Sequence, residues 1–164
     1  MKTRYFLAAL TALLMGTNTQ AQQTLADMVQ DANAGWMIGS WKAPTDNGGT
    51  FTMNLSWDLD RRVVVLHGKG DDMEFKGYSA LEPGGDQVTY VGFDNRGAIS
   101  KGAWGMENGE LVLRVSSQTD QGTWKMAAVF TSASGGGLNL RLHRIDDSGD
   151  MISPEQTLLR FKKS

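Results

Sequence analysis

Few side chains in the sequence could carry out acid–base or nucleophilic chemistry. The chain has two histidines, His67 and His143, and no cysteine. The lack of cysteine excludes a disulfide framework, a thiolate nucleophile and a Cys-ligated zinc or iron–sulfur site. An imidazole can act as a general base or bind a metal, and His67 with Glu74 is the one pairing that the sequence suggests for such a role.

Both histidines are nevertheless predicted to occupy surface or structural positions. His143 lies in an alternating segment and shares its phase with Asn139 and Arg141, which favours the solvent face. Two histidines without a demonstrated carboxylate partner are a weak basis for a catalytic or metal-binding role. We therefore expect no catalytic residue, no metal site and no cofactor.

Two polar segments resemble functional loops only in composition. The run 146–150 (DDSGD) has the acidic residues of a calcium loop but lacks its closing glutamate at the right offset, with Glu155 the nearest acid downstream. The run 132–137 (SASGGG) is neither a nucleophile elbow nor a phosphate-binding loop, because it lacks both motifs. Both segments are predicted to be solvated turns.

Large apolar side chains are the most informative feature of the sequence. Aromatic and methionine residues are adaptable walls for an apolar ligand, although they can equally fill a core. The predicted ligand-binding residues are Phe51, Met53, Leu55, Trp57, Phe75, Tyr90, Trp104, Trp124 and Met126.

These residues lie in short alternating runs that continue to the C-terminus. Residues 50–57 illustrate the pattern, with Phe51, Met53 and Leu55 on one face and polar residues on the other. Turn residues separate the runs. Ten strands are predicted, at 39–42, 50–57, 62–67, 73–81, 87–93, 98–106, 110–116, 123–130, 138–143 and 156–162.

The connections between these strands are of hairpin length, and no helix interrupts them, which excludes a parallel βαβ architecture. A meander this long must close or leave open edges. The fold class is therefore predicted to be all-β, an antiparallel up-and-down barrel of 8–10 strands, with a two-sheet sandwich as the alternative. A short helix over 24–34 precedes it, with Thr24 as N-cap, Asp27 completing a near capping box and Gly35 ending it.

The N-terminus predicts export. A basic start (Lys2, Arg4), an apolar run over 5–16 and the segment ending at Ala21 are typical of a signal peptide over 1–21. Its removal would leave 143 of the 164 residues and change the formal net charge from −2 to −4. An acidic protein is not expected to bind nucleic acid, and no membrane span is predicted. We expect a periplasmic or secreted protein, with a helix and lead-in over 22–38 and a barrel over 39–164.

The segment 36–41 (WMIGSW) resembles the entry to the lipocalin and wider calycin barrels, and the chain is also similar to small secreted bacterial calycin-like domains. In that family a Gly-x-Trp pair, here Gly39 and Trp41, begins the first strand. The Trp closes one barrel end beneath a basic residue of the last strand. The resemblance implies that Arg160 is this residue and that Gly39, Trp41 and Arg160 form a structural end-cap. Lipocalins usually carry a C-terminal helix after the barrel, whereas this sequence ends four residues after Arg160, so a ten-strand barrel nearer the fatty-acid-binding shape is an alternative.

The expected function is non-catalytic binding of a small apolar or amphipathic molecule inside the barrel. Two alternatives stay open at this point. One is a barrel enzyme, an isomerase or hydrolase, that uses His67 with Glu74 inside the cavity. The other is a filled barrel that acts as an interaction module through an exposed apolar patch.

Overall fold

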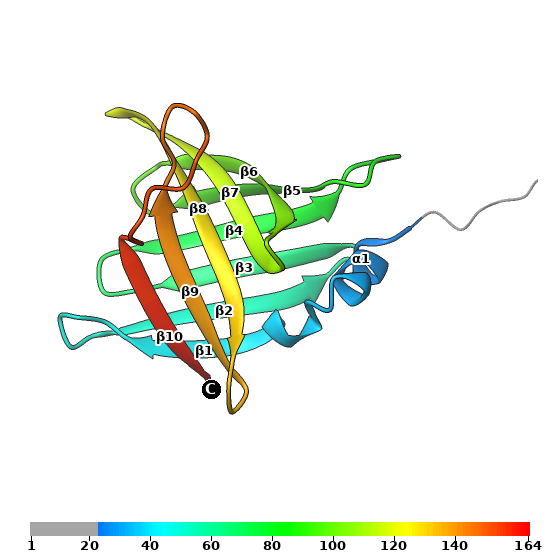
Figure 1. Cartoon of the computed structure of the whole chain (residues 1–164), viewed down its shortest axis with the longest axis horizontal. Coiled ribbons are helices and arrows are strands. Elements are labelled where there is room, and N and C mark those ends of the chain that lie inside the picture. Colours follow the sequence, from blue (N-terminus) through cyan, green and yellow to red (C-terminus); the bar gives the residue numbers. More distant parts are fainter. Residues whose placement is uncertain (1–22) are drawn as a thin grey trace, which may run out of the picture.

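The computed structural model describes residues 23–164, so the predicted signal peptide lies outside the described residues. Ten antiparallel strands form one closed barrel in which each strand pairs with its neighbours in the sequence and β1 pairs with β10 (Figure 1). The strands are β1 (Gly39–Pro44), β2 (Thr50–Asp58), β3 (Val63–Lys69), β4 (Glu74–Leu81), β5 (Val88–Asp94), β6 (Ile99–Glu107), β7 (Glu110–Thr119), β8 (Gly122–Ala133), β9 (Gly137–Arg144) and β10 (Thr157–Lys163). The predicted all-β antiparallel barrel is confirmed.

Alternation of apolar and polar residues determines which face of each strand is inside. In β2, Phe51, Met53 and Leu55 are buried and the intervening residues are more exposed. The apolar run in β3 gives no readable alternation in the sequence, yet Val64 and Leu66 are the buried residues there. Pairing with β2 and β4 fixes that phase, because a slip of one residue would turn every side chain of β3 to the other face.

The helix α1 (Leu25–Asp31) lies at one end of the barrel (Figure 1). The predicted capping box is present, since the Thr24 hydroxyl accepts the Asp27 N–H and the Asp27 carboxylate accepts the Thr24 N–H. The helix ends earlier than predicted because Asn33 has a φ of 49°. A single 3₁₀ turn (Gly35–Met37) then leads into β1. No helix within residues 23–164 is long and apolar enough to cross a membrane.

Trp41 is buried in the barrel core towards the end where α1 lies. Its side chain is only 2 % exposed, and its Nε1–H donates to the Met37 carbonyl at 2.8 Å. The cation over its ring is Lys163, whose Nζ lies 5.7 Å from the ring centroid. Gly39 supplies space for this lysine, because a Cβ at Gly39 would lie 3.1 Å from Lys163 Cε.

Arg160, which the resemblance implied for this place, is exposed on the outer wall. The reason is the two-residue period of β10. Phe161 is buried inside the barrel, so Arg160 points outward and Lys163 shares the inward phase. Lys163 is also the direct cross-strand neighbour of Trp41.

A segment without regular structure, residues 145–156, covers part of the outer wall. Ile145 and Met151 pack on a small outer cluster of Val112, Ala127 and Val129. Arg114 on β7 donates to the Gly149 carbonyl at 2.8 Å and forms two hydrogen bonds with Glu107, which hold the pKa of Glu107 below its usual value. This segment explains why some outward positions are buried.

We expect the two glycines of β6, Gly102 and Gly105, to respond oppositely to replacement by alanine. A Cβ at Gly102 would lie 2.0 Å from the backbone carbonyl oxygen of Arg114, whereas no atom lies within 4 Å of a Cβ at Gly105. Gly102→Ala must force β6 and β7 apart and should lower the free energy of unfolding by about 1–3 kcal/mol. Gly105→Ala should leave it unchanged or raise it slightly. Urea unfolding measures both, and equal effects would contradict the close β6–β7 contact.

Candidate functional site

The barrel encloses a cavity of about 480 Å³ at the end away from α1. A volume of this size is within the range of roughly 300–1,000 Å³ that holds small organic ligands. Its walls are mainly apolar side chains from the inward faces of the strands. They include Phe51, Met53, Leu66, Phe75, Leu113, Val115, Met126, Ala128, Phe130, Leu140, Leu142 and Leu159.

Tyr90 on β5 provides a polar group inside this cavity. Its side chain is 5 % exposed, and its hydroxyl takes part in no hydrogen bond within residues 23–164. Every fully buried side-chain nitrogen or oxygen in the described residues has a hydrogen-bond partner, so the Tyr90 Oη must be open to the cavity. A bound molecule could therefore donate to it or accept from it.

Two glycines leave room for the Tyr90 ring against the barrel wall. A Cβ at Gly77 would lie 2.2 Å from the ring, and a Cβ at Gly92 would lie 2.3 Å from Oη. Gly77 and Gly92 are cross-strand partners on β4 and β5. The ring therefore occupies the space that two inward side chains would otherwise fill, and Oη lies beside Gly92.

A second polar group lies in the same cross-strand row as Gly92. Gly92 pairs with Ser100 on β6, and Ser100 pairs with Ser117 on β7. The two serine hydroxyls are 2.6 Å apart, and both residues line the cavity. One wall, formed by β5, β6 and β7, is thus the polar side of an otherwise apolar chamber.

The mouth is the cavity rim at the end away from α1. Met73, Phe93 and Trp124 line the cavity there while remaining 37 %, 51 % and 45 % exposed. Asp46 and Asp94 are the acidic residues of the lining. Clusters of large, solvent-exposed apolar side chains are typical of binding surfaces.

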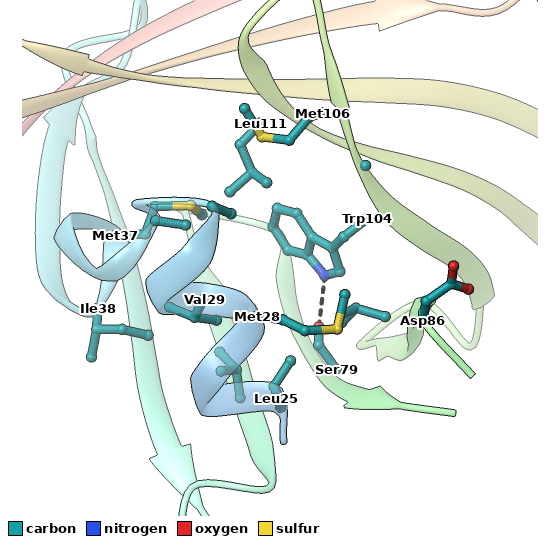
Figure 2. Close-up of a pocket in the computed structure, with 15 residues that line it drawn as sticks. Leu25, Met28, Val29, Met37, Ile38, Ser79, Asp86, Trp104, Met106 and Leu111 are labelled. Atoms are coloured by element: carbon teal, nitrogen blue, oxygen red, sulfur yellow. Dashed lines mark hydrogen bonds between the residues drawn. The ribbon is translucent and has the colours of Figure 1, made fainter. Parts of the chain in front are cut away.

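A second, smaller cavity of about 290 Å³ lies between α1 and the barrel (Figure 2). Met28 and Val29 of the helix face Trp104 of β6 across it (Figure 2). Trp104 Nε1–H donates to the Ser79 hydroxyl at 2.8 Å, so the polar atoms deep in this cavity satisfy each other. Trp104 also packs on Phe130, which lines the larger cavity, at a centroid distance of 5.3 Å. The Trp104–Phe130 pair therefore lies between the two cavities.

The predicted ligand-binding residues divide among three environments. Trp104 lines only the smaller cavity. Leu55 is buried in the core and Trp57 lies at the end of β2 beneath Arg61, and neither borders a cavity. The residues that line the larger cavity are Phe51, Met53, Phe75, Tyr90, Trp124 and Met126.

The structure brings His67 and Glu74 together, but outside the barrel. His67 Nε2 lies 2.8 Å from Glu74 Oε1, and Lys69 Nζ lies 3.2 Å from the other carboxylate oxygen. The bond from His67, followed by the bond from Lys69, lowers the pKa of Glu74. The inward residues of β3 are Val64, Leu66 and Gly68, so His67 faces solvent.

His143 also faces outward, as its phase predicted, but it is only 8 % exposed. Segment 145–156 covers it, and its Nδ1 lies 3.1 Å from the Ile152 carbonyl oxygen. Neither histidine borders the cavity.

The site residues predicted from the sequence did not include Ser100, Ser117, Asp46 or Asp94. Alternation in β6 would have placed Ser100 inside, because it shares the phase of Trp104. For Asp46 and Asp94 no sequence signal exists, since acidic residues at hairpin ends are normally solvated.

Tyr90 should titrate as a desolvated phenol. Burial raises its pKa from the ordinary value of 10 to about 12. The folded state thus holds this proton more tightly than the unfolded state, so its contribution to stability is complete below pH 10 and is lost as the pH rises towards 12. The phenolate absorbance that disappears in Tyr90→Phe should have a midpoint near pH 12, and a midpoint near 10 would contradict the burial.

No protein-family model matches the chain, and no curated protein matches it in sequence. The closed ten-strand antiparallel barrel is compatible with a calycin-like fold.

Proposed function

We propose that this protein binds a small apolar or amphipathic molecule in the larger barrel cavity and acts as a non-catalytic carrier. The observation that carries the proposal is the Tyr90 hydroxyl, which opens into an apolar chamber of about 480 Å³ and has no hydrogen-bond partner within the described residues. A ligand with one polar group could hydrogen-bond to this hydroxyl while its apolar part packs on the chamber walls. The signal peptide predicted over 1–21 supports a periplasmic or secreted location, and the calycin resemblance supports the same kind of function.

The distribution of polar groups favours binding over catalysis. The polar groups that converge inside the cavity are the hydroxyls of Tyr90, Ser100 and Ser117, with carboxylates only near the rim. His67 and Glu74, the pair considered for an enzyme, lie on the outer wall. Hydroxyl groups without an adjacent base can orient a ligand but cannot readily move protons.

A second candidate function rests on the outer wall of β4, β5 and β6. Tyr78 is the cross-strand partner of Val91, and Phe93 is the partner of Ile99. These four outward side chains are each between 38 % and 51 % exposed. An apolar surface of this kind is typical of a protein contact, and it supports an interaction module if the cavity proves to take no ligand.

The first experiment compares native and denatured mass spectra of the protein purified from cells that export it. A reproducible adduct that is lost on denaturation would support the carrier and reveal the mass of its cargo. The neutral apolar dye N-phenyl-1-naphthylamine then measures binding directly through its fluorescence. A bare protein that takes up neither the dye nor any lipid-like compound would contradict the proposal.

Filling the cavity should abolish this binding. Ala128 lines the larger cavity and is 6 % exposed, so Ala128→Phe places a ring in the space that a ligand would occupy. We expect dye affinity to fall about tenfold or more, which corresponds to roughly 1.4 kcal/mol or more.

The matched control is Ala103→Phe, which adds the same ring to the outer wall. Ala103 is the cross-strand partner of Thr89 and Arg114 and borders neither cavity. Its dye affinity should be unchanged, and circular dichroism should show that both variants fold. Equal dye affinities for the two variants would place the dye outside the barrel.

A further inference from the structure

We propose that the mouth of the larger cavity selects cationic amphiphiles, molecules with an ammonium head and an apolar tail. This inference rests on the proposed binding function and specifies its ligand class. The tail would lie against the aromatic and aliphatic walls, and the head would lie at the mouth between the carboxylates and the Trp124 ring.

The charge of the cavity lining has one sign. Asp46 and Asp94 are its charged residues, and no lysine, arginine or histidine of residues 23–164 lines it. Asp94 Oδ1 accepts the backbone N–H groups of Arg96 and Ala98 at 2.9 and 2.8 Å, which fixes the carboxylate at the start of the turn. No hydrogen bond within the described residues uses its second oxygen or the Asp46 side chain, so both remain available to a cation.

The neighbouring loops at the same end strengthen the negative potential. Asp71 and Asp72 lie in the β3–β4 loop, and Asn47 of the β1–β2 loop donates to Asp71 at 3.0 Å. Arg96 is the basic residue of the β5–β6 loop, and it pairs with Asp72 at 2.9 Å. One arginine does not balance these carboxylates together with Asp46 and Asp94, so the mouth keeps an excess of negative charge.

An aromatic ring at the mouth provides the second part of an ammonium site. Trp124 shares the inward phase of Met126 and Ala128 on β8, lines the cavity and is 45 % exposed. Trp124 lies in the same cross-strand row as Ser117, Ser100 and Gly92, so it is at the level of the polar wall. Ammonium groups bind over aromatic faces, and combined with carboxylates this is a favourable setting for a cation.

The Tyr90 hydroxyl is an independent indication of a ligand near the cross-strand row that contains Gly92 and Trp124. Tyr90 is 95 % buried and has no partner among the described residues, and its Oη lies beside Gly92, two residues before Asp94. The phenol is neutral at neutral pH, and its oxygen can accept an N–H from an amine head. A fatty-acid carboxylate placed there would instead meet Asp94 and be repelled.

Three probes with the same tail test this inference: protonated dodecylamine, dodecan-1-ol and dodecanoate. The affinity of each probe is measured by its displacement of N-phenyl-1-naphthylamine at pH 7. Each probe is kept below the concentration at which that probe forms micelles. We expect dodecylamine to bind about 3- to 30-fold more tightly than the alcohol, as two partly exposed ion pairs would provide, and dodecanoate to bind most weakly. Added NaCl should reduce the difference between dodecylamine and the alcohol.

The decisive variant is Asp46→Asn combined with Asp94→Asn. Asparagine keeps the Oδ1 acceptor of the Asp94 turn and removes the charge. We expect the preference for dodecylamine to be lost and the affinity for dodecan-1-ol to stay the same. The matched control, Asp60→Asn with Glu82→Gln, removes two carboxylates from hairpins at the α1 end and should keep the preference. If the double variant does not fold, Asp46→Asn alone should reduce the preference, because Asp46 is exposed in a loop.

The outcomes separate this inference from the proposed function. If the three probes bind with equal affinity, or dodecanoate binds best, the cavity still binds ligands and the preference for cations is overturned. If no probe displaces the dye and the protein carries no adduct, the proposed function fails and this inference fails with it.

Discussion

The pairing of β1 with β10 is the interaction on which the rest of the structure depends. An open meander of this length would leave two strand edges with unpaired N–H and C=O groups. The β1–β10 ladder is short, with Trp41 paired to Lys163 and Lys42 paired to Lys162. The Ser164 N–H also donates to the Ser40 carbonyl at 2.9 Å. The buried Trp41 ring beneath Lys163 lies at this seam. The packing of Lys163 on Trp41 therefore adds to the hydrogen bonds that join the first strand to the last.

Closure with ten strands determines how much space the barrel encloses. Side chains fill the interior of a barrel of about eight strands, and each added strand widens it. At the α1 end, large residues such as Trp41, Leu55 and Phe161 still fill the interior. Towards the mouth the same inward pattern surrounds about 480 Å³ of space, and Ala128 contributes little side-chain volume there. The larger chamber thus lies at the mouth end, and the smaller cavity lies beneath α1 at the other end.

The polar groups of the chamber are arranged along its length and around its circumference. The hydroxyls of Tyr90, Ser100 and Ser117 lie on one wall, and the carboxylates of Asp46 and Asp94 lie at the mouth. The opposite wall, which includes Leu140, Leu142 and Leu159, is aliphatic. A molecule that has one polar or charged end fits this arrangement in one direction. The outer wall carries the other polar pair, His67 with Glu74, where solvent competes for every hydrogen bond.

The strand pattern, the turns and the helix cap could be predicted from the sequence alone. Thr24 and Asp27 form the predicted box, and Phe51, Met53 and Leu55 face inward, because capping and alternation depend on residues close together in the chain. Which inward residues line the larger cavity depends on the tertiary structure. Met53 and Leu55 have the same phase on the same strand, but only Met53 lines the cavity. Alternation specifies the face of a residue and carries no information about its depth along the barrel. Similarly, the cation over Trp41 is Lys163 rather than Arg160, and Tyr90 rather than a histidine supplies the buried polar group, because closure of the barrel sets which distant residues meet.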